Sequence, residues 1–333
     1  MTKTTLKDIA RRLGVSTATV SYALNGAPGV SAELRLSILQ AARELNYQTN
    51  YAARSLARSR TNTVAWFRTT AQPPADPFSL SVFNLTAAAL QRAGYDTLMH
   101  TIDLARGIRS AADLLASRRV DGAVLSVDLV REGVVELLGQ GPPVVGLEVD
   151  SVQEGLPCVW PEYRRGVTAL FDYLMERGYR RIGFLAADPL EPTAQQRLAG
   201  FRDGYERRGL RVDPGWIMGG SYDFDAAKSA ARALLSGDAR LDAVMAATDR
   251  MAVAAVQAAQ ELGLRVPEDL AVTGFDDSEY AVYVSPALTT VRLAPSDIAR
   301  RLAATMLDWM ERPGVAAGGR VAVPVTLVVR QSA

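Results

Sequence analysis

Histidine and cysteine are almost missing from this chain of 333 residues, which has one of each, His100 and Cys158. A single cysteine cannot build a disulfide framework or a thiolate metal site. A single histidine excludes most hydrolase, nuclease and zinc chemistries, because these use histidine as a base or as a ligand. We therefore expect no catalytic residues, no metal and no cofactor, and we predict that the protein is not an enzyme.

Long apolar runs are also missing. No run reaches the ~18–20 residues that a membrane-spanning helix needs, and the first residues, Met1 to Asp8, lack the apolar segment of an export signal. Hydrophobic residues make up 48% of the chain and charged residues 22%, which is an ordinary globular balance. The sequence predicts a cytoplasmic protein of two or three domains, at roughly 100–200 residues each, with no membrane partner.

Acidic side chains are scarce at one end only. Residues 1–60 hold nine basic and three acidic side chains and carry a charge of +6, whereas the other 273 residues hold 28 basic and 33 acidic ones and carry −5. A basic head on a mildly acidic body is typical of a nucleic-acid-binding module joined to another domain. From charge alone, a solvated basic surface without a partner is the alternative.

The basic head has the apolar spacing of three short helices. The first runs from Leu6 to Leu13 and is ended by Gly14. The second runs from Thr17 to Asn25 behind a Ser16 cap, and a third begins at Ser31. The residues that these helices are expected to bury are Leu6, Ile9, Ala10, Leu13, Val20, Leu24, Leu34, Ile38, Ala42 and Leu45.

Ala10, Gly14 and Val20 have the spacing of a helix-turn-helix, in which a small residue lets two helices approach, a glycine permits the turn, and an apolar residue locks the second helix. That helix would present short polar side chains, which can reach base edges or phosphates in the major groove. The residues expected on its outward face are Ser16, Thr17, Ala18, Thr19, Ser21, Tyr22 and Asn25. A three-helix bundle with no ligand is the alternative.

Residues 49–61 are predicted to form a hinge between the head and the body. Asn50 can cap a helix from Tyr51 to Arg58, and a helix of about nine residues is marginal alone in water but can fold when two copies pack together on DNA. Leu56 is apolar within a basic and otherwise polar stretch. It can wedge into a minor-groove base step, or it can anchor the segment onto the following domain.

Several runs of the head and hinge closely resemble the LacI/GalR family of repressors. These runs are Leu6–Ala10, Gly14–Ser21, Leu24–Gly26, Val30–Ser31, Glu44–Tyr47 and Ala53–Leu56. The resemblance implies a recognition helix that reads half an operator, with Thr17, Ala18 and Tyr22 at the positions of the main base readers. It also favours Leu56 as a minor-groove wedge. The full set of predicted DNA-binding residues is Leu6, Ser16, Thr17, Ala18, Thr19, Ser21, Tyr22, Asn25, Ser31, Tyr47, Asn50, Ala53, Arg54 and Leu56.

From Val64 onward, short apolar runs alternate with amphipathic stretches, which predicts parallel sheets with helices on both faces. The expected strands are 64–67, 97–101, 122–127, 144–148, 182–187, 216–219, 243–247 and 270–275. The expected helices are 80–93, 108–117, 164–177, 194–208, 226–235 and 251–262.

This part resembles the periplasmic-binding-protein-like body of the same family. The matching runs are Gly178–Ile182, Arg197–Phe201, Thr248–Ala252, Val266–Leu270, Gly274–Asp277 and Leu288–Val291. The resemblance implies two lobes with a ligand between them, joined by three crossovers near 160–161, 290–293 and 320–324. The expected fold is therefore a small all-α helix-turn-helix head with a hinge helix, followed by an α/β body of two lobes. The predicted bounds are 1–48 for the head, 49–61 for the hinge and 62–333 for the body, with an N-lobe of about 62–160 plus 293–320 and a C-lobe of about 161–292 plus 321–331.

The resemblance also implies an effector site. Arg197, Thr248 and Asp276 match positions that contact effector hydroxyls or carboxylates in relatives, and Tyr222 matches one where an aromatic ring often stacks on the ligand. An arginine and a carboxylate facing one pocket can bind the vicinal hydroxyls of a sugar. The predicted effector-binding residues are Thr69, Phe78, Trp160, Arg197, Tyr222, Thr248 and Asp276. A salt bridge within one lobe, and core packing of the aromatic residues, are the alternatives.

We thus predict a repressor that binds a pseudo-palindromic, double-stranded operator as a homodimer and is switched by a small polar effector, a sugar or a sugar derivative. The chain ends in one apolar strand, 321–329, without the heptad helix by which family members form tetramers. A sugar-binding transport receptor and an enzyme acting on sugars or nucleotides are the rival classes. Whether the effector releases or promotes DNA binding is open.

Overall fold

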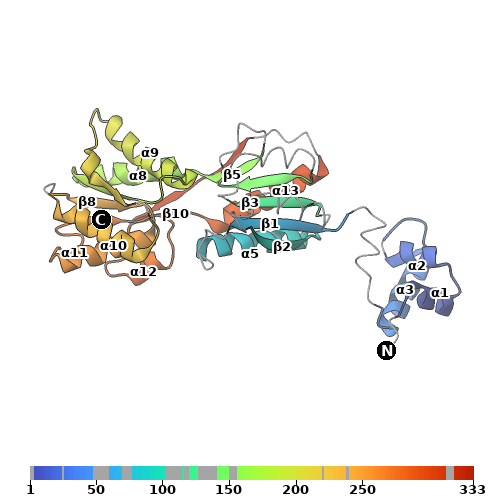
Figure 1. Cartoon of the computed structure of the whole chain (residues 1–333). Coiled ribbons are helices and arrows are strands. Elements are labelled where there is room, and N and C mark those ends of the chain that lie inside the picture. The colour runs from blue at the N-terminus through green and yellow to red at the C-terminus, as the bar shows by residue number, and fades with distance from the viewer. Residues whose placement is uncertain are drawn as a thin grey trace. The chain divides into compact units, whose positions relative to one another are not determined.

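In the computed structural model the chain divides into two units, Met1–Thr61 and Asn62–Ala333, which we call the head and the body (Figure 1). The structure describes residues 4–24, 26–47, 60–69, 77–102, 115, 120–126, 141–149, 156–219, 221–237, 240–312 and 319–333. The expected hinge helix lies outside these described residues. Within them, no helix is long and apolar enough to cross a membrane.

The head is a bundle of three helices, α1 (Leu6–Leu13), α2 (Thr17–Leu24) and α3 (Ala32–Glu44). The backbone N–H of Thr5 donates to the Asp8 carboxylate at 2.9 Å, so an acidic residue in the first turn satisfies a donor at the start of α1. The predicted order and approximate bounds of the three helices are confirmed.

The helices of the head enclose one small core. Its fully buried residues are Ile9, Ala10, Val20, Ala23, Ile38, Ala41 and Ala42. Gly14 has a φ of 66°, a conformation that glycine adopts without strain, and it ends α1 and turns the chain toward α2. The predicted helix-turn-helix spacing of Ala10, Gly14 and Val20 therefore does place an alanine and a valine in the contact between helices.

The N-lobe of the body is built on a parallel sheet of six strands in the order β11-β5-β4-β3-β1-β2. These strands are β1 (Thr63–Thr69), β2 (Asp96–Ile102), β3 (Gly122–Ser126), β4 (Val144–Leu147), β5 (Cys158–Pro161) and β11 (Arg320–Val323). Helices α5 (Pro77–Arg92) and α13 (Pro295–Glu311) pack against each other and share a buried cluster with the sheet, to which Trp66, Val124 and Ile298 belong.

Helix α13 is absent from the sequence expectations, although it is 17 residues long. Its buried residues include Ile298, Leu302, Met306 and Met310, which recur at every fourth position, and Pro295 stands in its first turn. Both features are helix signals that the sequence carries. The omission is thus an error of interpretation, and the buried face of α13 completes the N-lobe core.

The C-lobe is built on a parallel sheet of four strands in the order β7-β6-β8-β9. These strands are β6 (Ile182–Ala186), β7 (Ile217–Gly219), β8 (Ala243–Ala246) and β9 (Ala271–Thr273). The helices are α8 (Tyr163–Glu176), α9 (Pro192–Glu206), α10 (Phe224–Ser236), α11 (Asp249–Glu261) and α12 (Tyr280–Tyr283). In Figure 1, α8 and α9 lie on one side of the sheet and α10 and α11 on the other. The α/β body with helices on both faces is confirmed.

Two short crossover segments pair with each other, since β10 (Thr290–Arg292) and β12 (Thr326–Val328) form an antiparallel ladder. The single final strand predicted at 321–329 is wrong. The chain forms β11 at the edge of the N-lobe sheet, passes Pro324, and then forms β12. Proline has no N–H to donate to a ladder, so the chain changes sheets at this residue.

Strand β5, which ends where the first crossover is predicted, is a buried strand between β4 and β11. It has four residues and ends in Pro161, and both features argue against a central strand. The first crossover therefore lies at Glu162, directly before α8, where the Glu162 N–H donates to the Val323 carbonyl at 3.0 Å. The helix expected at 108–117 lies outside the described residues, apart from Leu115.

Candidate functional sites

The outward face of α2 is the first candidate site. Thr17, Ala18 and Tyr22 are exposed, and 55% of the Tyr22 surface is open to solvent. Val20 and Ala23 point the other way and are buried in the head core. The core thus fixes the helix so that the three residues matched to base readers face outward.

Two other predicted residues of this face are used within the helix. The Thr19 N–H donates to Ser16 Oγ at 3.0 Å, and the two hydroxyls lie 2.8 Å apart. Ser16 therefore caps α2, as the sequence predicts. Ser21 is half-buried, and Asn25 lies outside the described residues.

The basic side chains of the head fall into two groups. Arg35 is half-buried and donates to the carbonyls of Ala23 and Ala27, at 3.3 and 2.6 Å. It therefore satisfies acceptors where α2 ends, and it is structural. Lys7, Arg11 and Arg12 are exposed and can reach phosphates, although Arg11 also pairs with Asp8 at 3.7 Å and Arg12 pairs with Glu44.

The remaining predicted DNA contacts are mixed in character. Leu6 and Tyr47 are half-buried and pack against the head core, while Ser31 is exposed and accepts the Leu34 N–H at 3.3 Å as the cap of α3. The predicted hinge residues lie outside the described part of the chain, namely Asn50, Ala53, Arg54 and Leu56. Their roles stay predictions.

The second candidate site is centred on Arg197 of α9. Arg197 is only 5% exposed, and its Nη2 lies 3.3 Å from Oδ1 of Asp276, in the turn that follows β9. Its guanidinium also lies over the rings of Tyr163 and Phe275, 4.5 and 4.9 Å from their centroids. The structure therefore brings together the arginine and the carboxylate assigned to effector binding, in a salt bridge within the C-lobe. Such a bridge is also what the alternative interpretation of the sequence expects.

Arg197 keeps its charge despite its burial. Burial works against the charged form, but Asp276 and the nearby Tyr222 and Tyr163 outweigh it and raise the pKa of Arg197 above its ordinary value. No described residue accepts a hydrogen bond from the buried Nε of Arg197. An unpaired buried donor costs about 1–3 kcal/mol, and an acceptor on a bound ligand would recover that energy.

Asp276 is held in an unusual backbone conformation with a φ of 111°. Its N–H donates to the Val291 carbonyl at 2.8 Å, and the Leu293 N–H donates back to its carbonyl at 3.2 Å. The adjacent Asp277 is paired at 2.6 Å with Arg292 and at 2.5 Å with Arg330. Only the first acid of this pair is directed to Arg197.

Burial opposes the ionisation of Asp277, but hydrogen bonds from the two arginines lower its pKa below the ordinary value. A carboxyl group held ionised by two cations is a structural anchor. The geometry therefore gives no support to acid/base chemistry by Asp276 and Asp277 together.

Thr248 and its neighbour Asp249 form the support beneath this turn. Thr248 Oγ1 accepts the Met251 N–H at 3.2 Å and so caps α11, which leaves its O–H donor for the predicted effector contact. Asp249 is fully buried and accepts from the Ser278 N–H at 2.7 Å and from the Thr290 hydroxyl at 2.5 Å. Burial raises the pKa of Asp249 to about 6. The sequence expectations omit this residue, although a carboxylate directly after a strand end is a recognisable signal.

The aromatic candidates differ in where they lie. Tyr222 is half-buried beside Arg197, and burial raises its pKa. Trp160 is 5% exposed, and the guanidinium of Arg320 covers its ring at 4.5 Å. Phe78 is half-buried and packs against the apolar clusters of the body. Thr69 ends β1, and its side chain lies outside the described residues.

Tyr163 and Glu148 are functional candidates that the sequence expectations omit. Tyr163 Oη donates a short hydrogen bond to Glu148 Oε1, and both residues are buried. Glu148 directly follows β4, at the carboxyl end of a parallel strand, where ligands of α/β sheets commonly bind. Its position was thus a usable signal, whereas nothing in the sequence indicates its pairing with Tyr163.

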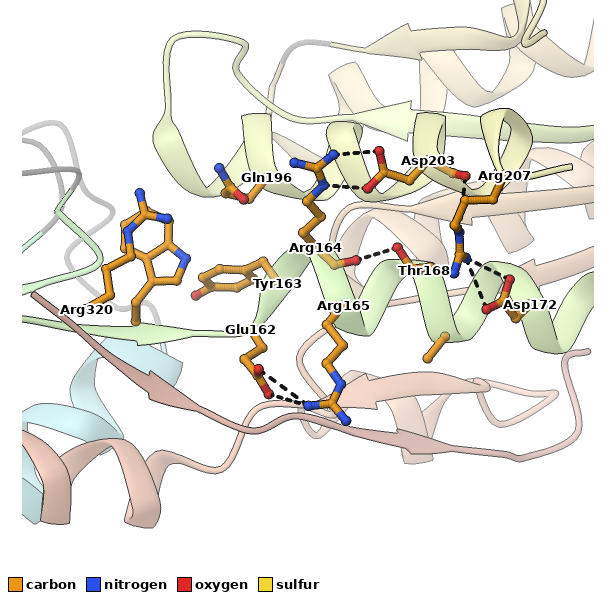
Figure 2. A pocket seen from close by; sticks show the side chains of 12 residues that line it. Glu162, Tyr163, Arg164, Arg165, Thr168, Asp172, Gln196, Asp203, Arg207 and Arg320 are labelled. Carbon is orange, nitrogen blue, oxygen red and sulfur yellow. Dashed lines mark hydrogen bonds and ion pairs between the residues drawn. The ribbon is translucent and has the colours of Figure 1, made fainter. Parts of the chain in front are cut away.

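A separate groove of about 590 Å³ runs along α8 and α9 (Figure 2). Its charged side chains pair across the groove, with Arg164 on Asp203 at 2.7 Å and Arg207 on Asp172 at 3.0 Å. Arg197 does not line it, although its neighbour in sequence, Gln196, does. The groove shares Trp160 with the predicted effector-binding residues, and it also includes Tyr163, whose ring lies under the Arg197 guanidinium. In the described part of the chain, no group of three or more His, Cys, Asp or Glu residues could hold a metal ion.

Two family models match the chain. The model of the bacterial regulatory proteins of the lacI family matches residues 5–50, and that of the periplasmic binding protein-like domain matches residues 171–333. The first match covers the three-helix head, and the second covers most of the C-lobe together with the returning N-lobe elements α13 and β11.

Similarity to individual proteins extends over head and body together. The chain is 31% identical over 341 residues to the ribose operon repressor of Haemophilus influenzae, and the match covers 98% of each chain. A complex of the transcriptional regulator CelR with cellobiose matches at a TM-score of 0.74 and 29% identity, over 99% of this chain and 100% of that one. A lac repressor dimer bound to operator and the anti-inducer ONPF matches at a TM-score of 0.88 and 25% identity, over 99% of each chain.

We expect Asp249 to give the body a characteristic pH dependence. With a pKa raised from 3.8 to about 6, the folded carboxyl holds its proton between about pH 4 and 6, whereas the unfolded one has released it. The contribution of Asp249 to the free energy of unfolding therefore falls as pH rises through this window. Relative to Asp249→Asn, which cannot ionise, the wild type should lose on the order of 1–3 kcal/mol between pH 4 and 7.

Urea unfolding at pH values from 4 to 7.5 measures this difference. Asp269→Asn is the matched control, because hydrogen bonds from Arg265 lower the pKa of Asp269 to about 2, so its stabilising contribution disappears only as the solution becomes more acidic than about pH 4. A difference between the wild type and Asp249→Asn that stays constant over the whole range would contradict the prediction.

Proposed function

Because this chain belongs to the LacI family of bacterial regulatory proteins, we propose that it is a transcriptional repressor that binds double-stranded operator DNA as a homodimer. A small polar effector, bound by the body, switches its affinity for the operator. The observation that carries the proposal is the exposed polar face of α2, fixed by a helix-turn-helix core in the basic head and joined to a two-lobed ligand-binding body. The protein acts on chromosomal DNA in the cytoplasm.

The rival classes explain less of the chain. A sugar-binding transport receptor would account for the body but not for a basic head with a helix-turn-helix. An enzyme would need reacting groups, whereas Asp277 is locked by two arginines and Asp249 supports a turn. The similar proteins over the full length are transcriptional regulators.

The charge of the site favours an effector without a formal charge. Arg197, the one buried cation among the described residues, is already compensated by Asp276, and Glu148 adds a further buried carboxylate nearby. A phosphate or carboxylate would therefore meet two acids for one arginine, whereas a hydroxyl can accept from the Arg197 Nε and donate to Asp276. We expect a sugar or sugar derivative, in agreement with the cellobiose bound by CelR.

Both lobes have exposed apolar side chains that suit the predicted dimer. On α12, Val282 is 51% and Tyr283 is 81% exposed, and on the edge strand β2, Leu98 and Met99 are 36% and 37% exposed. Exposed apolar surface of this kind marks interaction sites. A two-fold symmetric dimer would bury these side chains and would set two heads against the two halves of a pseudo-palindromic operator.

The first prediction from this function concerns base reading. In site selection from random duplex DNA, Tyr22→Ala should change the preferred base at one position of each half-site, by roughly 1–3 kcal/mol of discrimination. Leu36→Ala is the control, because Leu36 is 68% exposed on α3 but is outside the predicted contact set. The affinity of the wild type should also fall steeply as salt rises. An unchanged base preference in Tyr22→Ala would remove Tyr22 from the base readers.

The second prediction concerns the effector. A thermal-shift screen of sugars, sugar alcohols and nucleosides against the full chain identifies a binder, and calorimetry then compares variants. Arg197→Ala should bind it at least about tenfold more weakly, because hydrogen bonds to a charged donor are lost. Arg207→Ala is the control, since it removes an arginine from the same helix that pairs with Asp172 instead.

In the absence of effector, operator affinity should be nearly the same in both arginine variants and in the wild type. Loss of operator binding in a folded Arg197→Ala protein without effector would contradict the separation of the two sites. A wild type that selects no DNA sequence at all would contradict the proposed function itself.

The third prediction concerns assembly. Tyr283→Asp should shift the protein from dimer to monomer at micromolar concentration, because a charge at a two-fold interface is buried twice. Leu190→Asp is the control, since Leu190 is 72% exposed in a loop outside the proposed interface. Light scattering measures the mass. A monomeric wild type, a stable tetramer, or a Tyr283→Asp protein that stays dimeric would overturn this assignment.

A further inference from the structure

The hydrogen bond between Tyr163 and Glu148 joins the two lobes of the body. Glu148 belongs to the N-lobe, where it follows β4 and its N–H donates to the Val159 carbonyl of β5 at 3.0 Å. Tyr163 is the first residue of α8 in the C-lobe, directly after the first crossover, as Figure 2 shows. Its hydroxyl donates to the Glu148 carboxylate.

We propose that this hydrogen bond is an interlobe latch: it holds the N-lobe and the C-lobe in one fixed arrangement, which binding of the effector then changes. Tyr163 is a positioning residue, because it acts by holding Glu148 of the other lobe. The latch goes beyond the proposed function, and only its link to operator binding rests on that function. Neither residue belongs to the predicted effector-binding set.

The burial of both groups makes the latch strong. Tyr163 is 1% exposed and Glu148 is 7% exposed. A carboxylate at this depth is stable only with donors close to it, so separating it from the phenol costs more than breaking an exposed hydrogen bond. Burial, together with the charge of Glu148, raises the pKa of Tyr163 well above its ordinary value, so the phenol stays protonated and remains the donor.

The backbone of Glu148 indicates that its position is imposed by its surroundings. Its φ of 59° lies in the left-handed region, which a residue with a Cβ occupies at some cost. The bond between its N–H and Val159 and the bond between its carboxylate and Tyr163 both act on this one residue. Opening of the lobes at the crossover would break the second bond and leave the first in place.

The latch is in direct contact with the effector site. One face of the Tyr163 ring lies under the Arg197 guanidinium at 4.5 Å, and the Phe275 ring lies 5.8 Å away at an interplanar angle of 33°. The edge-to-face contact with Trp160, at 6.2 Å, connects the same ring to β5 of the N-lobe. An effector that accepts a hydrogen bond from the Nε of Arg197 therefore contacts a guanidinium that is stacked on the Tyr163 ring.

Hydrogen exchange of the full-length protein, without DNA or effector, tests the latch. Tyr163→Phe removes only the hydroxyl, and we expect faster amide exchange on both sides of the crossover, in 144–149 and in 158–166, by about tenfold. Tyr173→Phe is the matched control, because Tyr173 lies on the same helix and its hydroxyl donates at 2.9 Å to the Ala333 carbonyl within the C-lobe. Its effect should be confined to the end of α8 and the C-terminus.

Glu148→Ala approaches the same bond from the other lobe. It should give the same exchange pattern as Tyr163→Phe, and the double variant should add little to either, because both substitutions remove one interaction. Glu148→Gln retains an acceptor for the phenol and should restore most of the protection. If one of these substitutions prevents folding, the other variants still test the latch. Circular dichroism shows whether each variant is folded.

Exchange that rises on one side of the crossover only, or additive effects in the double variant, would overturn the latch. Affinity for a duplex obtained by site selection tests the functional link, and Tyr163→Phe should differ from the wild type by threefold or more while Tyr173→Phe matches it. An unchanged affinity with altered exchange would overturn the link to DNA binding. A wild type that binds no DNA would defeat the proposed function, and the exchange result would still decide the latch.

Discussion

The buried guanidinium of Arg197 is the group around which the proposed effector site is organised. A charge at this depth is stable only beside a carboxylate, which Asp276 supplies at 3.3 Å, and against polarisable surfaces, which the rings of Tyr163 and Phe275 supply. These contacts leave the Nε donor without a partner among the described residues. The contacts that stabilise the buried charge of Arg197 therefore leave its Nε free to donate a hydrogen bond to a ligand.

This pairing depends in turn on the crossover strand β10. Asp276 holds a φ of 111° because its N–H bonds to Val291 of β10, and because Asp249 fixes the turn through Ser278 and the Thr290 hydroxyl. The strand leads directly to α13 of the N-lobe. A ligand at the proposed effector site that moved Asp276 would therefore act on a segment that connects the two lobes.

The sequence predicts most structural features that depend on neighbouring residues, and few of the contacts between residues that are far apart in the chain. Helix caps and the Gly14 turn lie within a few residues of the helices they bound, so the head could be predicted almost completely. Three-residue strands have no periodicity, and the pairing of Thr290 with Val328 depends on residues far apart in the chain, so β10 and β12 were not foreseen. The family resemblance supplied the arginine–aspartate pair, but no pattern links Tyr163 to Glu148, because their contact exists only once the lobes are folded.

The residues predicted to read DNA and those predicted to bind the effector differ in their burial. Tyr22 is exposed, so a substitution there alters a contact surface without removing buried apolar area, whereas Arg197 and Trp160 are each 5% exposed. The residues of the head core, by contrast, tolerate mainly substitutions that keep their volume and apolar character. A chain can therefore keep this fold at about 31% identity to a relative while its recognition surfaces differ. For that reason the operator and the effector of this protein follow from its own exposed and site-lining residues, and not from those of its relatives.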